Sequence, residues 1–189
     1  QYEINPYPRW RYTYEKLPAN SLTILNNQIK PNKVNFSDKF NNPKILIAGC
    51  GTGKHIFIAQ NYLNAKMLVV DLSKTSLAYA KRKVEQSGND NVEFLHADIL
   101  ELKNLNRKFD IIESVGVLHH MKNPLKGLEV LLNFLEPHGY LKLGLYSQIA
   151  RQGLLKIKKL AERNKLKGTV EDIRNFRKLL IYDEKKDHL

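Results

Sequence analysis

The 189-residue sequence predicts an α/β fold, a doubly wound parallel sheet with helices on both faces. The first observation is alternation: between residues 44 and 147, short apolar runs take turns with longer segments of helical periodicity. The second is that the short runs are apolar at almost every position, which is typical of strands covered on both faces.

The expected elements follow in order along the chain. A first helix is predicted over 21–29, where apolar side chains recur on one face before Pro31. Apolar runs then predict five strands, at 44–48, 67–70, 92–95, 109–114 and 139–146. Helical periodicity predicts helices between the strands at 53–61, 73–88 and 124–134, and the second of these starts with Ser73 and stops at Gly88. Two further helices are predicted over 148–164 and from Thr169 onward.

The composition divides the chain into three zones. Residues 1–43 are rich in proline, asparagine and aromatic side chains, and we expect an N-terminal arm that covers the site as a lid; simple packing on the sheet is the alternative. Residues 44–147 form the predicted core. Residues 148–189 form a basic helical extension that carries half of the net charge of +12. A solvated helical face explains this charge, and binding to nucleic acid or to an anionic membrane is the less favoured alternative.

Composition also bounds the environment of the protein. No apolar run has the length of a membrane span, and the N-terminus lacks the pattern of a signal peptide. The single cysteine, Cys50, excludes an internal disulfide and suits a cytoplasmic protein, with a buried structural role favoured over a nucleophilic one. Because the first residue is Gln1, we expect a chain cut from a longer protein. No metal site is expected.

A glycine-rich turn follows the first predicted strand directly and precedes a helix. Its glycines, Gly49, Gly51 and Gly53, form the pattern G-x-G-x-G, which lets a ligand approach the backbone closely. Asp71 ends the second strand, where a carboxylate accepts hydrogen bonds from ribose hydroxyls, or alternatively caps the next helix. Asp98 follows the third strand and is placed to accept a hydrogen bond from an adenine amino group, or is an ordinary loop acid.

At these residues the chain resembles the class I S-adenosylmethionine-dependent methyltransferases, over residues 44–147. The resemblance implies a Rossmann-like sheet of order 3-2-1-4-5, with the usual sixth and seventh strands absent from this chain. It implies S-adenosylmethionine as the cofactor and S-adenosylhomocysteine as the product. The cofactor-binding residues that it implies are Gly49, Cys50, Gly51, Gly53, Asp71, Leu72, Asp98, Ile99 and Ser114. It also implies that Glu113 and Val115, with Ser114, face the sulfonium and the acceptor.

Two features near the expected site leave alternatives open. The family usually has an acidic residue two places before the first glycine, where this chain has Ile47. Lys54 and His55 are candidates for a charged contact to the methionine carboxylate, and the equally supported alternative is that both side chains point to solvent. After the fourth strand, His119 and His120 are candidate general bases, although a structural role in the turn is favoured.

A closer resemblance concerns the segments at 1–10, 47–53 and 145–151, which are similar to bacterial methyltransferase domains joined to tetratricopeptide repeats. The expected function is methyl transfer by in-line displacement to a small-molecule or protein acceptor that the sequence does not identify. The alternatives are an RNA methyltransferase that uses the basic helices, and a cofactor-binding or assembly module without turnover. An exposed edge of the fifth strand predicts cover by the basic helices or a homodimer.

Overall fold

The computed structural model describes residues 3, 6–12, 18–32 and 38–183. The chain divides into two compact units, Gln1–Leu145 and Tyr146–Leu189, which are described separately. Parts of the predicted arm, at 1–2, 4–5, 13–17 and 33–37, lie outside the described residues.

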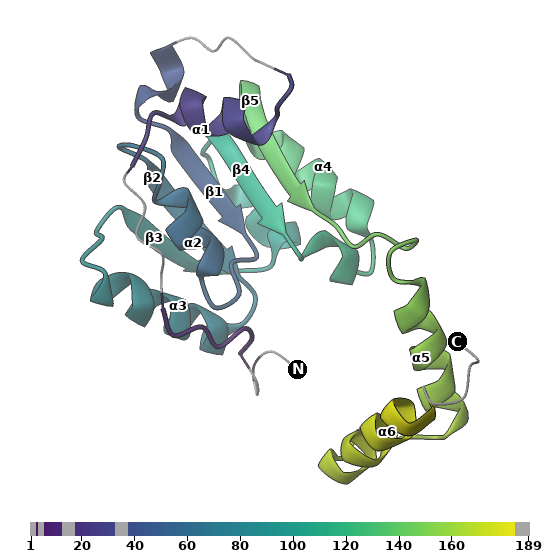
Figure 1. The fold of residues 1–189 in the computed structure, drawn as a ribbon. Helices are drawn as coiled ribbons and strands as arrows, with labels where there is room; N and C mark the ends of the chain where they lie inside the picture. The colour runs from purple at the N-terminus through teal and green to yellow at the C-terminus, as the bar shows by residue number, and fades with distance from the viewer. Residues whose placement is uncertain (1–2, 4–5, 13–17, 33–37, 184–189) are drawn as a thin grey trace. The chain divides into compact units, whose positions relative to one another are not determined.

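The first unit is built around a five-stranded sheet (Figure 1). Its strands are β1 (Lys44–Ala48), β2 (Lys66–Asp71), β3 (Val92–His96), β4 (Phe109–Val115) and β5 (Leu135–Gly144). All neighbouring strands are parallel, and their order is β3-β2-β1-β4-β5. The predicted sheet order is therefore confirmed, and the carboxyl ends of β1 and β4 meet where the strand order reverses.

The fifth strand corrects the predicted boundaries, because it spans Leu135–Gly144 and not 139–146. It follows α4 without a turn, and its pairing with β4 shifts register between Phe109 and Ile111. The extra residues form an irregularity in which His138 has a φ of 66°. The irregularity sets which residues of β5 face those of β4 farther along the strand.

Helices cover both faces of the sheet and close two apolar cores. One face carries α1 (Ser21–Gln28), α2 (Lys54–Ala59) and α3 (Lys74–Gln86). The other carries α4 (Pro124–Phe134) with two 3₁₀ helices, η2 (Ile99–Asn104) and η3 (Leu118–His120). A further 3₁₀ turn, η1 (Asp38–Asn41), precedes β1. Because both faces are covered, the strands need the continuous apolar character that predicted them.

The helix α3 shows how the sequence sets the start and inner face of an element. The hydroxyl of Ser73 accepts a hydrogen bond from the amide of Ser76 at 3.1 Å, as an N-cap does. Leu77, Ala80 and Val84 are buried along one side of the helix against the sheet. The helix therefore begins beside the end of β2, where Asp71 stands.

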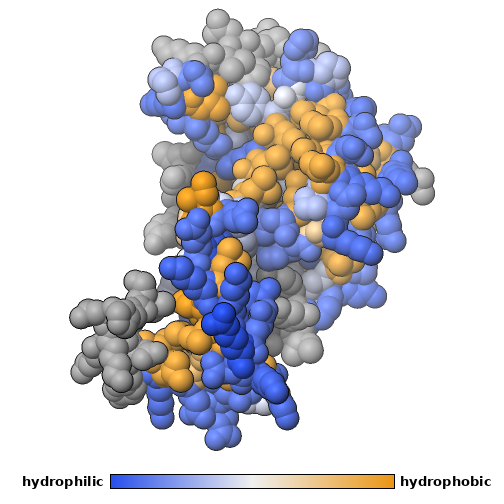
Figure 2. Space-filling view, turned by 90° about the vertical axis from the view of Figure 1, so that its right-hand side faces the viewer, coloured by the Kyte–Doolittle hydropathy of each residue, from blue (hydrophilic) through white to orange (hydrophobic). Residues whose placement is uncertain are grey.

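The outer edge of β5 is also an edge of the whole sheet, since in the described part of the chain no further strand pairs with it. Figure 2 shows apolar side chains gathered in the upper part of the view. Leu125 and Leu132 of α4 and Leu143 of β5 are among the exposed apolar residues. What covers this edge stays a prediction.

The second unit consists of α5 (Gln152–Arg163) and α6 (Val170–Asp183). The first of these begins later than predicted, because residues 148–151 form a turn in which the Ser147 hydroxyl accepts from the Ala150 amide at 3.2 Å. Gly168, with a φ of 77°, separates the two helices. Within the part of the chain that the structure describes, no helix combines the length and apolar character of a membrane span.

Candidate cofactor site at the carboxyl edge of the sheet

Three glycines shape the turn between β1 and α2. Gly49, Gly51 and Gly53 have φ angles of 81°, 53° and 92°, a left-handed region that glycine adopts most readily. The amides of Gly49 and Cys50 both donate to the carbonyl oxygen of Val70, at 2.8 and 3.1 Å. The glycine loop is thereby attached to the end of β2 as well as to β1.

Two of these glycines also provide room. A Cβ added to Gly49 would lie 2.3 Å from Cγ2 of Val117, and one added to Gly53 would lie 2.8 Å from Cβ of Ala80. Neither distance is compatible with normal van der Waals contact. Glycine at these positions therefore lets the loop approach the segment after β4 and lets α2 approach α3.

Asp71 anchors the glycine loop from the end of β2. Its Oδ2 accepts a hydrogen bond from the amide of Gly51 at 2.7 Å, and its Oδ1 accepts one from the amide of Ser73 at 2.8 Å. A carboxylate has about four acceptor sites, so each oxygen keeps capacity for another donor. The helix-start contact and a contact to a ribose are therefore compatible roles for one side chain.

Asp98 lies at the same edge of the sheet. Asp71 is the register partner of His96, and the Ala97 amide donates to the Asp71 carbonyl oxygen at 3.2 Å. The Oδ1 atom of Asp98 accepts from the amide of Leu100 at 2.9 Å, which starts η2. The glycine loop and both carboxylates are thus placed at the carboxyl ends of neighbouring strands.

The remaining cofactor-binding candidates differ in exposure. The side chain of Leu72 is 66% exposed and available to a ligand. Ile99 is 6% exposed and packs in the core against α4, so only its backbone is left to contact a ligand. Ser114 is buried within the sheet at 1% exposure. The Cys50 thiol donates to the carbonyl oxygen of Gly51 at 3.2 Å, and burial raises its pKa well above the ordinary value, which favours the predicted structural role.

His119 and His120 lie together in η3, on the chain segment that follows β4. Their ring centroids are 4.3 Å apart with a tilt of 54°. His119 is half-buried and His120 is exposed. A role as general base stays a prediction for both.

The described part of the N-terminal arm lies against the glycine loop. The Thr52 hydroxyl donates to the carbonyl oxygen of Pro8 at 2.6 Å, and Nε1 of Trp10 donates to the carbonyl oxygen of Thr52 at 3.0 Å. The indole ring also meets the Phe57 ring edge-on at a centroid distance of 5.0 Å, and the Trp10 carbonyl accepts from the Tyr79 hydroxyl at 2.6 Å. The arm is therefore tied to the loop and to α2 and α3.

A buried polar cluster beneath this edge contains residues that the sequence alone did not bring together. Glu113 of β4 is 1% exposed and pairs in register with Lys142 of β5, whose Nζ is 3.6 Å from Glu113 Oε2. Burial raises the pKa of Glu113, and the attraction of Lys142 opposes that rise. Burial and the nearby negative charge of Glu113 also raise the pKa of Tyr62. The available signal was Lys142, the one charged residue in the predicted strand 139–146, but the partner of this lysine depends on the register of β5.

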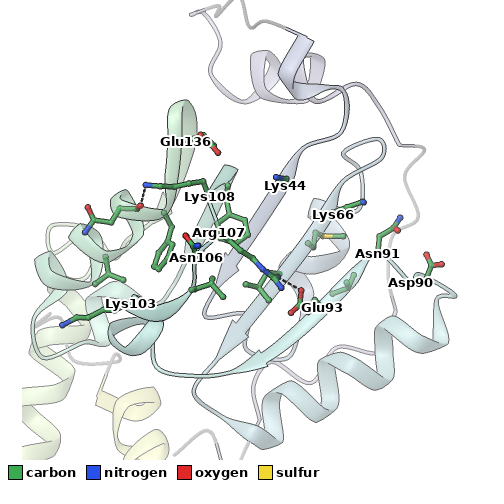
Figure 3. A pocket seen from close by; sticks show the side chains of 18 residues that line it. Lys44, Lys66, Asp90, Asn91, Glu93, Lys103, Asn106, Arg107, Lys108 and Glu136 are labelled. Atoms are coloured by element: carbon green, nitrogen blue, oxygen red, sulfur yellow. Dashed lines mark hydrogen bonds and ion pairs between the residues drawn. The ribbon is translucent and has the colours of Figure 1, made fainter.

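A cavity of about 1030 Å³ lies away from this site, at the amino edge of the sheet (Figure 3). Its lining includes Lys44 and Lys66 at the starts of β1 and β2, and Arg107, which pairs with Glu93. None of the predicted cofactor-binding residues lines it. The carboxyl edge is therefore the candidate cofactor site despite the size of this cavity.

Sheet order, glycine loop and adjacent carboxylates together define a Rossmann-like cofactor-binding domain. More specifically, the chain belongs to a family described as methyltransferase domain, whose family model matches residues 39–187.

Individual relatives agree with this membership. An uncharacterized protein of Synechococcus sp. is 37% identical over 111 residues, 58% of this chain and 27% of its own length. A tRNA U34 carboxymethyltransferase of Aeromonas hydrophila is 37% identical over 101 residues, 52% of this chain and 30% of its own length. The structure of PKMT2 from Rickettsia typhi in complex with AdoHcy has a TM-score of 0.67 and 27% identity, over 78% of this chain and 29% of that one. The chain spans between 27% and 44% of the length of the first curated relatives it matches.

Proposed function

We propose that this chain binds S-adenosylmethionine along the carboxyl edge of the sheet and transfers its methyl group to a small-molecule or protein acceptor. The observation that carries the proposal is the double role of Asp71, which holds the Gly51 amide at 2.7 Å beside a second strand-end carboxylate, Asp98. Backbone amides on one side and two carboxylates on the other suit a ligand with an adenosine end and a polar amino-acid end.

The residues present fit such a cofactor. The two oxygens of Asp71 each accept one amide and keep lone pairs for the two ribose hydroxyls. The exposed side chain of Leu72 offers an apolar surface to the adenine ring. Asp98 uses one oxygen for the Leu100 amide and keeps the other for the adenine amino group. Ile99 contributes through its backbone amide, because its side chain is buried in the core.

The cofactor supplies a methyl group that is already activated by the positive charge of its sulfonium. What remains for the chain is to align an acceptor with that methyl group and to exclude water. The arm, tied to the glycine loop through Thr52 and Trp10, covers the loop side of the site. His119 or His120 accepts a proton where the acceptor must lose one.

Titration calorimetry with S-adenosylhomocysteine tests the cofactor assignment. The chain should bind this product, and Asp71→Asn should weaken binding by about tenfold or more, since hydrogen bonds to charged groups contribute about 1.5–3 kcal/mol. Asp110→Asn is the matched control, because Asp110 caps the amide of Lys44 at the opposite edge of the sheet and should leave affinity unchanged. Failure of the unaltered chain to bind would overturn the assignment.

Turnover is tested separately, by formation of S-adenosylhomocysteine from S-adenosylmethionine in the presence of acceptor mixtures. Product formed with small molecules or proteins supports the proposed acceptor class. Binding without product for every mixture favours a cofactor-binding module without turnover.

RNA is the second candidate acceptor, favoured by the basic character of residues 148–189 and by the tRNA U34 carboxymethyltransferase among the relatives. Binding to phosphates would weaken steeply with salt, with a slope that reports the number of contacts. RNA binding that is insensitive to salt, or absent, would remove this candidate. The single cysteine, which forms no disulfide, suits a cytoplasmic location, and the link to tetratricopeptide repeats stays a prediction.

A further inference from the structure

Lys142 stands at the candidate cofactor edge but belongs to neither the glycine loop nor the carboxylates. It is the register partner of Glu113 on β5, and Glu113 is in turn the register partner of Ile47, two residues before Gly49. The Lys142 side chain is 33% exposed, whereas that of Glu113 is 1% exposed. Lys142 is therefore the part of this buried pair that a ligand can reach.

A second observation directs Lys142 toward the start of α2. Burial lowers the pKa of His55, in the first turn of α2, and the positive charge of Lys142 lowers it further, so the two side chains lie in the same part of the site. The Nδ1 atom of His55 is buried and has no hydrogen-bond partner among the described residues. Buried polar atoms normally have partners, so this ring nitrogen is available to a ligand group.

The chemistry of this pair selects an anion. The Lys142 ammonium has three donors, and its 3.6 Å separation from Glu113 Oε2 is too long for a good hydrogen bond. Burial raises the pKa of Glu113, which disfavours the charged form that would pair with Lys142. A carboxylate accepts from both an ammonium and a ring N–H, and charge-assisted hydrogen bonds of this kind are the strong ones.

The position of the cluster selects which carboxylate. The adenosine end of the cofactor is assigned to the ends of β2 and β3, beside Asp71 and Asp98, so the methionine end must extend past the glycine loop toward β4 and β5. We propose that Lys142, held in place by Glu113 and assisted by His55, binds the carboxylate of the methionine moiety of S-adenosylmethionine. This rests on the proposed function, because it assumes that the cofactor binds at this edge.

Two ligands separate this proposal from the assumption beneath it. S-adenosylhomocysteine has the amino-acid carboxylate, whereas 5′-methylthioadenosine keeps the adenosine and sulfur but lacks it. Because removal of Lys142 alone would leave Glu113 buried without a partner, the comparison is made between Glu113→Gln and the double variant Glu113→Gln/Lys142→Met. Calorimetry should show that S-adenosylhomocysteine binds about 10- to 100-fold more weakly to the double variant, while 5′-methylthioadenosine binds both equally.

Controls exclude a general loss of structure. Lys66→Met makes the same substitution at the amino end of β2 and should not change either affinity. Lys142→Arg keeps the positive charge and should retain most of the affinity for S-adenosylhomocysteine.

The outcomes are distinguishable. If the unaltered chain binds neither ligand, the proposed function fails. If it binds both but the double variant keeps its affinity for S-adenosylhomocysteine, or loses affinity for both ligands equally, the assignment of Lys142 is overturned while the proposed function stands.

Discussion

Replacement of Gly49 by alanine tests whether the glycine loop depends on both its backbone angle and its closeness to Val117. A residue with a side chain at the observed φ of 81° costs about 1–2 kcal/mol. The new Cβ would also lie 2.3 Å from Cγ2 of Val117, and overpacking of this kind costs about 1–3 kcal/mol. Gly49→Ala should therefore lower the free energy of unfolding by about 2–5 kcal/mol.

The chain offers a matched control in the same loop. Gly51 also has a positive φ, 53°, but an added Cβ would lie 3.7 Å from the carbonyl oxygen of Tyr7, an ordinary contact. Gly51→Ala should thus cost only the backbone contribution of about 1–2 kcal/mol. Combining Gly49→Ala with Val117→Ala should remove the two closest contacts and leave only Cβ of residue 117, at 3.1 Å. The double variant should therefore lose about 1–3 kcal/mol less than the sum of the single variants.

Urea unfolding monitored by circular dichroism and by the fluorescence of the single tryptophan, Trp10, measures these differences. Equal stability of Gly49→Ala and Gly51→Ala would refute the packing argument. So would strict additivity of Gly49→Ala and Val117→Ala, because it would mean that the two side chains never meet.

The remaining predictions concern other contacts of the site. Asp71→Asn should lower the free energy of unfolding by about 1.5–3 kcal/mol, because its new NH₂ group would face one of the two backbone amides from which the carboxylate accepts. Asp98→Asn should have a smaller effect, because the asparagine keeps an oxygen that accepts from the Leu100 amide. Calorimetric melting measures both variants, and equal melting temperatures would contradict the prediction. Burial raises the folded-state pKa of Glu113 above its ordinary value of 4.5, so ionisation opposes folding and stability should fall as pH rises from about 4.5 through the folded pKa. Glu113→Gln should abolish that fall in a pH series of urea unfolding curves, and parallel curves for the two proteins would count against it. Trp10→Phe removes the hydrogen bond to the carbonyl oxygen of Thr52 and should cost about 0.5–1.5 kcal/mol in urea unfolding monitored by circular dichroism alone, an expectation that an unchanged midpoint would contradict.

The central part of the fold followed from local sequence properties. Residues 45–48 of β1 and 67–70 of β2 are unbroken apolar runs, and β4 is mainly apolar; such runs indicate strands whatever their neighbours are. The glycine spacing and the strand-end carboxylates could be placed because both follow directly from where a strand stops. The parallel arrangement brings those stops to one edge, so Asp71 and Asp98 come close without any knowledge of side-chain packing.

The boundaries of β5 could not be predicted, and the reason is physical. Pro137 and Gly139 are typical of loops, which favoured a strand that starts only at Gly139. In the structure the strand begins at Leu135, immediately after α4, and absorbs the loop-forming residues in an irregularity where His138 has a positive φ. Tertiary pairing with β4 outweighs the local preference.

This irregularity also explains why the Glu113–Lys142 pair escaped sequence reasoning. The two residues are 29 positions apart, and they face each other only because the register shifts between Phe109 and Ile111. A regular pairing that continued from Phe109 and Leu135 would have placed Glu113 opposite Gly139. A polar cluster that depends on long-range register leaves no pattern in the local sequence.

The absence of an acid before the glycine loop acquires a structural meaning from the same contacts. With Ile47 buried at 2% exposure, β1 provides no carboxylate to the loop, and the loop amide of Gly51 is held from β2 by Asp71 instead. The side chain proposed to bind the ribose is then also the side chain that orders the loop for the methionine end. A change at Asp71 should therefore weaken the binding of both S-adenosylhomocysteine and 5′-methylthioadenosine. A change at Lys142 should weaken the binding of S-adenosylhomocysteine alone. The affinities for the two ligands therefore report which strand end contacts which part of the cofactor.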